Sequence, residues 1–206
     1  MKKILFLSLF SLIILVSCKD NTTSPVSQTV IWPLAVGNYW VIKISIYDST
    51  GKSVFIQIDT MKVISDSIIN SEKVYNIQLL HDTIFSFDYN YLCNRADGLY
   101  NYFNINNSFV ASLVLKYSGN AGDTYISDSS TIKIDSINAI VKVPAGNFEC
   151  YKYSVEYFNG FYWEKGPIYL SPGIGFIYEE YYIPLNYNSN SFRLAMTWEL
   201  LSYKLY

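Results

Sequence analysis

Histidine occurs only once in this chain of 206 residues, as His81, and this scarcity limits the chemistry that the chain can perform. A single imidazole excludes metal sites built from several histidines, and a Ser–His–Asp relay would depend on His81 alone. No G-x-S-x-G elbow is present. The adjacent Glu179 and Glu180 point to opposite faces of a strand, so they cannot form a glycosidase pair by themselves. We therefore expect no enzyme, no metal site and no cofactor.

Helix-forming patterns are equally scarce. After the first residues, no segment of eleven or more repeats its apolar positions with the period of a helix, and Ala and Glu are few. By contrast, the chain has 20 Tyr, 12 Phe and 4 Trp, together with many Ile, Val and Thr. Such side chains suit the half-buried surface of a pleated sheet. The composition therefore predicts an all-β fold.

The N-terminal apolar run is too short to be a permanent membrane span. Lys2 and Lys3 precede apolar residues 4–16, whereas a spanning helix needs about 20 residues. A charged start, a short apolar core and a small-residue cleavage site are typical of a secretory signal peptide. Residues 15–18, Leu-Val-Ser-Cys, resemble a bacterial lipobox, in which Cys18 becomes the acylated first residue. We expect residues 1–17 to form a signal-peptide helix outside the core and residues 18–29 to form a lipidated, flexible tether.

Lipidation of Cys18 implies anchoring to a membrane. One acyl chain attaches weakly, whereas the diacylglycerol and further palmitate-type chain that such cysteines receive hold firmly. Cleavage lowers the 15 basic residues to 13 against 17 acidic residues, without a basic cluster, so we expect no nucleic-acid partner. Lys19-Asp20 resembles the surface-export signals of some Gram-negative lipoproteins. The predicted location is thus the outer membrane, on its surface face, with the periplasmic face as the alternative.

Residues 30–206 read as a single domain of about a dozen strands. Alternation is clearest near the end, where Phe192, Leu194 and Met196 share one face. Earlier in the chain, Val54, Ile56 and Ile58 share a face. The apolar residues that follow occupy the alternate positions of the strand, a change that a bulge would cause. The predicted architecture is an antiparallel meander forming a curled sheet or barrel. The expected strands are 40–47, 53–65, 73–80, 84–93, 99–105, 109–117, 124–126, 131–143, 147–158, 161–170, 174–183 and 192–200.

Two cysteines remain after Cys18 is assigned to the anchor. Cys93 and Cys150 lie in a chain expected to reach an oxidising compartment, where a disulfide between them is allowed. The alternative is a pair of free, buried thiols that act as small hydrophobic groups. A domain of this size does not need the bridge for stability. Both alternatives stay open at this point.

Three short motifs relate the chain to a family. Residues 32–40 read W-P-L-x-x-G-N-x-W, residues 143–152 read V-P-A-G-x-F-x-C-x-K, and residues 169–177 read Y-x-x-P-G-x-G-x-I. Together they resemble uncharacterised bacterial lipoproteins, sometimes labelled TapB-like or grouped with domains of unknown function. The resemblance covers most of the chain after Cys18. It implies a shared fold and a place in the cell envelope, and it supplies no mechanism.

The excess of aromatic residues is the feature with a functional interpretation. Structural packing explains most of these rings. A subset marks a weak candidate ligand site, consisting of Tyr151, Tyr153, Tyr157, Trp163 and Tyr178. In one hypothesis, a curled sheet holds a hydrophobic small molecule in a β cavity. In the alternative, exposed rings bind a surface glycan or an envelope protein. A structural envelope component without a small ligand is the third hypothesis.

Overall fold

A computed structural model of the chain describes residues 30–81, 91–127, 130–158, 163–186 and 191–206. Within them the predicted all-β class is confirmed. No described residue belongs to a helix long and apolar enough to cross a membrane. The predicted signal peptide and tether, including Cys18, lie outside the described residues. The strands are β1 (Tyr39–Tyr47), β2 (Ser53–Ile69), β3 (Glu72–Leu79), β4 (Leu92–Arg95), β5 (Gly98–Ile105), β6 (Ser108–Lys116), β7 (Thr124–Ser127), β8 (Ser130–Val143), β9 (Gly146–Phe158), β10 (Trp163–Ser171), β11 (Gly175–Pro184) and β12 (Phe192–Lys204).

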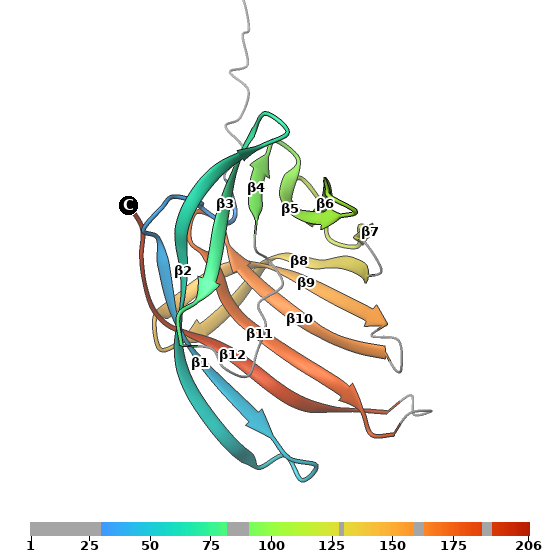
Figure 1. Cartoon of the computed structure of the whole chain (residues 1–206). Helices are drawn as coiled ribbons and strands as arrows, with labels where there is room; N and C mark the ends of the chain where they lie inside the picture. Colours follow the sequence, from blue (N-terminus) through green and yellow to red (C-terminus); the bar gives the residue numbers. More distant parts are fainter. Residues whose placement is uncertain (1–29, 82–90, 128–129, 159–162, 187–190) are drawn as a thin grey trace, which may run out of the picture.

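These strands form one antiparallel sheet in the order β6-β5-β4-β3-β2-β1-β12-β11-β10-β9-β8-β7. Neighbours in the sheet are also neighbours in the chain, except at β1 and β12, where Trp40 lies opposite Tyr203. This ladder joins two meanders, β1 to β6 and β7 to β12. The sheet curls so that its outer strands β6 and β7 approach each other (Figure 1). The result is the expected meander, curled into a nearly closed barrel.

Tyrosine hydroxyl groups bridge the seam where the barrel nearly closes. The hydroxyl of Tyr125 on β7 accepts a hydrogen bond from the Lys116 N–H (3.1 Å) and donates one to the Val114 carbonyl (3.1 Å) on β6. The hydroxyl of Tyr153 on β9 donates to the Lys116 carbonyl (2.9 Å). Burial raises the pKa of Tyr125 to about 12, so its hydroxyl stays a neutral donor. Side chains thus supply hydrogen bonds that a backbone ladder would otherwise provide.

The short turns follow the local sequence. Between β1 and β2, the carboxylate of Asp48 accepts hydrogen bonds from the backbone N–H groups of Thr50 (2.8 Å) and Lys52 (3.0 Å). Gly51 adopts a φ of 81°, as a turn closed by a bulge with glycine requires. Two-residue turns with positive φ at both positions join β2 to β3 and β5 to β6, at Asn70–Ser71 and Asn106–Asn107.

The first and third sequence motifs meet in the core. The Nε1–H of fully buried Trp40 donates to the Ile174 carbonyl (2.7 Å). The ring of Trp32 packs edge-on against Trp40, with centroids 5.7 Å apart. A Cβ atom at Gly175 would lie only 2.5 Å from the Trp32 ring, so glycine is required there. These motif residues therefore pack the turn before β11 against the start of β1.

The second motif forms the tip of the β8–β9 hairpin. Register shifts in β8 near Ser136 bend this long hairpin. Its tip contacts β12, where the Phe148 ring lies 6.2 Å from that of Tyr203 and the Ala145 N–H donates to the Leu200 carbonyl (3.3 Å). The motif therefore closes one end of the barrel.

The bulge predicted in β2 after Ile58 is wrong at that position, although β2 does shift register against β3 between Val63 and Ser65. The pairing of β2 with β1 is regular from Lys62 to Phe55, so no residue is inserted where the apolar phase shifts. Val54, Ile56 and Ile58 instead face outward and are 59%, 61% and 60% exposed. Met61 and Val63 face the core and are fully buried. The inward positions between Phe55 and Met61 are the polar residues Gln57 and Asp59, so this part of β2 is apolar outside and polar inside.

The expected strand 84–93 is largely untested, because residues 82–90 lie outside the described residues. Its end is displaced: β4 continues through Asn94 and Arg95, which were expected in a turn. The guanidinium of Arg95 pairs with Glu72 on β3 (2.7 Å), and this contact extends the strand. The chain then turns at Ala96 and Asp97.

Candidate functional site

The inward side chains of the barrel can be followed from strand to strand. Residues directly opposite each other on antiparallel strands share a face of the sheet. One inward row contains Ile134 (β8), Tyr153 (β9), Ile168 (β10), Glu179 (β11), Trp198 (β12), Ile44 (β1) and Gln57 (β2). The next row contains Ile132, Val155, Gly166, Tyr181, Met196, Ile46 and Phe55.

Exposure of this inward face rises toward one end of the barrel. In the deeper rows, Trp40, Ile42 and Leu170 are fully buried. Toward the other end, Phe55 is 38% and Tyr157 is 42% exposed. The strand ends at this side lie at the bottom and lower right of Figure 1. We call the inward residues at this end the mouth: Phe55, Gln57, Tyr157, Glu164, Ile168, Glu179, Tyr181, Met196 and Trp198.

Glu179 is the unusual residue of the mouth. It lies between Ile168 on β10 and Trp198 on β12. The residue is partly exposed, and its carboxyl lies on the apolar inward face of the sheet. Among the described residues, no side chain or backbone group forms a hydrogen bond or ion pair with this carboxyl. Burial therefore raises the pKa of Glu179 to about 7, so both protonation states are populated near neutral pH.

A second carboxyl group, Glu164, lies on the same inward face, four residues along β10 from Ile168, the residue opposite Glu179. Glu164 on β10 accepts a hydrogen bond from the hydroxyl of Tyr181 on β11. Gly166 on β10 allows β10 and β11 to approach closely. Any other residue there would place its Cβ atom 1.7 Å from the Glu180 carbonyl oxygen. The missing side chain thus helps to position Tyr181 against Glu164.

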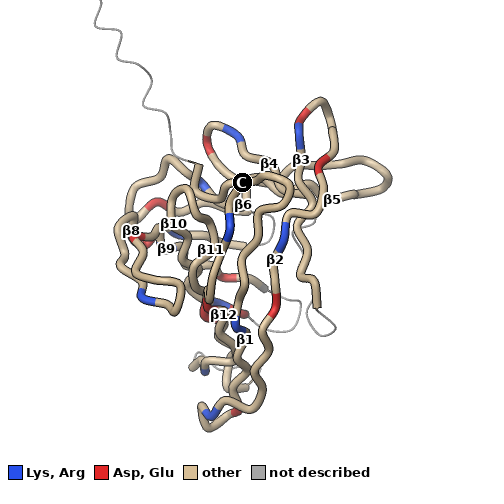
Figure 2. The backbone as a smooth tube through the Cα atoms, turned by 90° about the vertical axis from the view of Figure 1, so that its left-hand side faces the viewer, with Lys and Arg blue, Asp and Glu red and all other residues tan. Residues whose placement is uncertain are grey.

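The charges are divided unevenly between the two faces of the sheet. Asp59 is buried on the inward side, where its carboxylate accepts hydrogen bonds from the Gln57 side chain (3.2 Å) and the His81 backbone N–H (3.0 Å). The neighbouring lysines lie on the outward side: Lys43, Lys133, Lys152 and Lys165. Along the described strands, charged positions of both signs are scattered (Figure 2). The inward side of the mouth carries carboxyl groups, whereas these lysines lie on the outward side.

The structure separates the aromatic residues that were predicted to form one site. Tyr151 and Tyr153 stack in the core with centroids 6.1 Å apart. Tyr157 lies in the mouth, whereas Tyr178 faces outward and donates to the Glu180 carboxylate (3.2 Å). The Trp163 side chain lies outside the described part of the structure. Only Tyr157 among the described members therefore contributes to the mouth.

A shallow groove with a volume of about 460 Å³ crosses the sheet from β9 to β12. The Lys165 ammonium lies 3.9 Å from the centroid of the Phe192 ring. The Tyr182 hydroxyl donates to the Glu180 carboxylate (2.9 Å), which fixes the ring beside the groove. The lining residues are Ser154, Val155, Glu156, Lys165, Gly166, Pro167, Tyr182 and Phe192.

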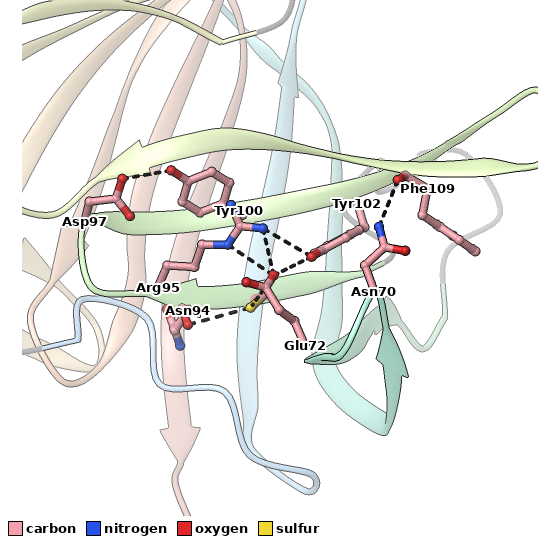
Figure 3. Close-up of polar contacts among 9 residues, drawn as sticks. Asn70, Glu72, Asn94, Arg95, Asp97, Tyr100, Tyr102 and Phe109 are labelled. Carbon is pink, nitrogen blue, oxygen red and sulfur yellow. Dashed lines mark hydrogen bonds and ion pairs between the residues drawn. The ribbon is translucent and has the colours of Figure 1, made fainter.

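Another polar cluster connects β3, β4 and β5 (Figure 3). The Glu72 carboxylate accepts hydrogen bonds from the Arg95 guanidinium (2.7 and 3.1 Å) and from the Tyr102 hydroxyl. Arg95 thereby lowers the pKa of Glu72, and it also lies over the Tyr100 ring at 4.0 Å. Because its charged groups pair with one another, this cluster fastens three strands and leaves no free ligand-binding group.

Both remaining cysteines are free, buried thiols, so the disulfide alternative is wrong in this structure. Cys93 packs with Val74 and Tyr102 in a small cluster of its own, whereas Cys150 belongs to the main core. Burial raises the pKa of both thiols, that of Cys150 to about 12. The two residues therefore act as small apolar groups in separate places.

Metal-ligating groups do not gather within the described part of the chain. No group of three or more His, Cys, Asp or Glu residues there could hold a metal ion. His81 is a surface residue, as predicted, with a side chain 69% exposed and Nδ1 3.3 Å from the Asp59 carboxylate.

Sequence reasoning placed Glu179 and Glu180 on opposite faces, and the structure confirms this separation. It did not identify Glu179 as a candidate site residue. A signal was available, because Glu179 alternates with the buried Ile177 on an otherwise aromatic and apolar strand. The order of the strands in the sheet places Glu179 beside Trp198 and Ile168, and the alternation along one strand does not reveal that order.

Comparisons with known proteins are distant. No protein-family model and no curated protein matches the chain. A solved structure from Parabacteroides distasonis ATCC 8503, provisionally classed as a lipoprotein, has 15% identity and a TM-score of 0.47, covering 85% of this chain and 99% of that one. An exported protein of Bacteroides fragilis NCTC 9343 with a YmcC-like fold, also provisionally classed, has 15% identity and a TM-score of 0.44, covering 86% and 100%. Likenesses at this level assign no function to this chain.

Proposed function

We propose that this chain is a cell-envelope lipoprotein whose barrel binds an amphipathic small molecule in the mouth without transforming it. The observation that supports this most directly is the unpaired carboxyl of Glu179, set among Ile168 and Trp198 on a partly exposed inward face. The lipid on Cys18 would hold the barrel at the membrane, where amphipathic molecules are abundant.

The physical argument starts from the cost of that carboxyl. A buried polar group without a partner is unfavourable, and strongly perturbed carboxyl groups concentrate at functional sites. Ligand sites are largely apolar with a few placed polar groups, and the mouth combines Phe55, Met196 and Trp198 with Glu179 and Glu164. No thiol or hydroxyl of the described residues is hydrogen-bonded to Glu179, which favours binding over nucleophilic catalysis.

Anchoring is tested by changing the lipobox cysteine. We expect the Cys18→Ala variant, expressed in a Gram-negative host, to lose acylation and to leave the detergent-phase membrane fraction, because no lipid chain then holds it. Cys150→Ala serves as the control, since that thiol is buried in the core. Mass spectrometry of the N-terminal peptide together with fractionation provides the measurement. A Cys18→Ala variant that remains in the detergent phase would contradict anchoring through this residue.

The face of the outer membrane on which the domain lies needs a separate measurement. Lys19-Asp20 supports the surface face of the outer membrane as our proposal. Protease treatment of intact cells should then degrade the domain, and complete protection would favour the periplasmic face.

Binding is tested on the form that lacks residues 1–18, which retains all the strands of the barrel. We expect an amphipathic small molecule to co-purify and to be recovered by solvent extraction and mass spectrometry. The Trp198→Ala variant should retain less of it, because Trp198 forms part of the mouth. Tyr203→Ala, remote from the mouth, provides the comparison. An extract without any such molecule, from protein that also binds no added amphiphile, would favour a purely structural envelope role.

The outer groove supports a second candidate function. Phe192 and Tyr182 offer ring faces, and Lys165 and Glu156 offer polar groups, a combination suited to a surface glycan or an envelope-protein loop. Loss of glycan-array binding in a Phe192→Ala variant, with mouth binding retained, would assign that activity to the groove.

A further inference from the structure

This inference rests on the proposed function and specifies the ligand. We infer that the amphipathic ligand is a cation, with a protonated amine that pairs with the Glu179 carboxylate while its apolar part contacts the mouth. Glu179 has no partner among the described residues and lies in an inward row with Ile168 and Trp198. An alkylammonium ion would supply the missing positive charge and the hydrogen-bond donors in one group.

The charges around the mouth disfavour an anionic head group. Asp59 and Glu164 are the other carboxyl groups on this inward side, where Asp59 accepts hydrogen bonds from Gln57 and His81 and Glu164 accepts one from Tyr181. The neighbouring lysines lie on the opposite face of the sheet. Arg193 on β12 donates its guanidinium to the Tyr47 carbonyl (3.2 Å) rather than to Glu179. Among the described inward residues of the mouth, a fatty acid or phosphate would therefore meet carboxyl groups and no lysine.

The apolar surroundings distinguish an amine from a neutral alcohol. An ion pair between Glu179 and an ammonium group strengthens where water is excluded, and Trp198 offers a ring that also attracts cations. A hydroxyl group brings only one neutral hydrogen bond. Since charge-assisted hydrogen bonds are about twice as strong as neutral ones, amines should bind more tightly than alcohols of equal length.

The proposal also predicts how binding depends on pH. The titratable groups on the same inward face are Tyr157, Glu164, Tyr181 and Asp59, and Arg193 on β12 is held by the Tyr47 carbonyl. An alkylamine remains protonated through pH 8, as a lysine side chain does. Glu179 must lose its proton to form the ion pair, so amine affinity should rise as the pH increases from 5 to 8. Alcohol affinity should not rise in this way, because no ionised carboxylate is required.

The experiment uses protein lacking residues 1–18, with decylamine, 1-decanol and decanoic acid as probes below their micelle-forming concentrations. Isothermal titration calorimetry at pH 8 should show that decylamine binds about tenfold or more tightly than 1-decanol, and that Glu179→Gln removes this preference. Glu149→Gln, which neutralises an exposed carboxyl near the β8–β9 tip and outside both the mouth and the groove, should leave the preference intact. Circular dichroism confirms that each variant is folded.

The outcomes separate the inference from the proposed function. Equal binding of the amine and the alcohol, or an amine preference that survives Glu179→Gln, would overturn the cation assignment and leave an amphiphile-binding mouth. Preferred binding of decanoic acid would overturn it as well. Failure of all three probes to bind would overturn both the inference and the binding role of the mouth.

Discussion

Replacing Glu179 with glutamine is expected to raise the free energy of unfolding at pH 8 by about 2 kcal/mol and to change it little at pH 4. In the folded chain, burial raises the pKa of Glu179 to about 7 from its ordinary value of 4.5. Between these values the folded state holds a proton that the unfolded state has lost. Stability is therefore full below pH 4.5 and falls as the pH rises through 7. Glutamine stays neutral and removes this loss.

Denaturant unfolding of the two proteins at pH 4, 6 and 8 measures the effect. The wild-type midpoint should fall more steeply with pH than that of Glu179→Gln, so that the two curves separate only above pH 4.5. Glu156→Gln, on the outward side of β9, should run parallel to the wild type. If Glu179→Gln were equally stable or less stable at pH 8, the carboxyl would already have a favourable partner, contrary to the geometry described above.

Placing a methyl group at Gly166 is expected to lower the free energy of unfolding by about 3 kcal/mol. The Cβ atom of alanine would lie 1.7 Å from the carbonyl oxygen and 2.8 Å from the carbonyl carbon of Glu180. These are backbone atoms, so relief requires β10 and β11 to move apart. That separation weakens their hydrogen bonds and draws Glu164 away from the Tyr181 hydroxyl.

Thermal and denaturant unfolding of Gly166→Ala measure this loss, and amphiphile binding should weaken along with stability. Gly51→Asn is the matched control, because a Cβ atom there meets nothing within 4 Å and Asn tolerates the positive φ of that turn. A Gly166→Ala protein as stable as the wild type would show that the two strands can separate freely at this position.

The fold class followed from composition and alternation, because both depend on local side-chain preferences. Tight turns depend in the same way on single residues, since Gly51, Asn106 and Asn107 adopt the positive φ that their turns require. The positions of the strands followed for the same reason.

What failed was the assignment of faces in β2. The stripe of Val54, Ile56 and Ile58 was grouped with the apolar pattern of the strand, although it faces outward. Alternation shows which residues share a face but does not show which face is inward. The usual assumption is that the apolar residues of a strand face inward. It fails in this part of β2, because the inward residues are the polar Gln57 and Asp59. This exception occurs at the mouth, where a binding site needs polar groups inside.

The candidate site was hidden for a related reason. Five aromatic residues were grouped by sequence proximity, yet Tyr153 is in the core and Tyr178 faces outward. Glu179 meets Trp198 only because β11 lies beside β12, and Ile168 only because β10 lies on its other side. Tertiary pairing, rather than any local pattern, brings the site together.

The order of the strands has a consequence for how the chain folds. Every ladder joins consecutive strands except β1–β12, which connects residues as distant as Trp40 and Tyr203. Consecutive hairpins form early because their loops are short, whereas the long loop closed by β1–β12 costs more entropy and forms late. In a chain that emerges with its N-terminus first, one edge of β1 therefore stays unpaired until β12 arrives. During that interval the exposed edge can pair with other chains, so aggregation is expected mainly before β12 has been made.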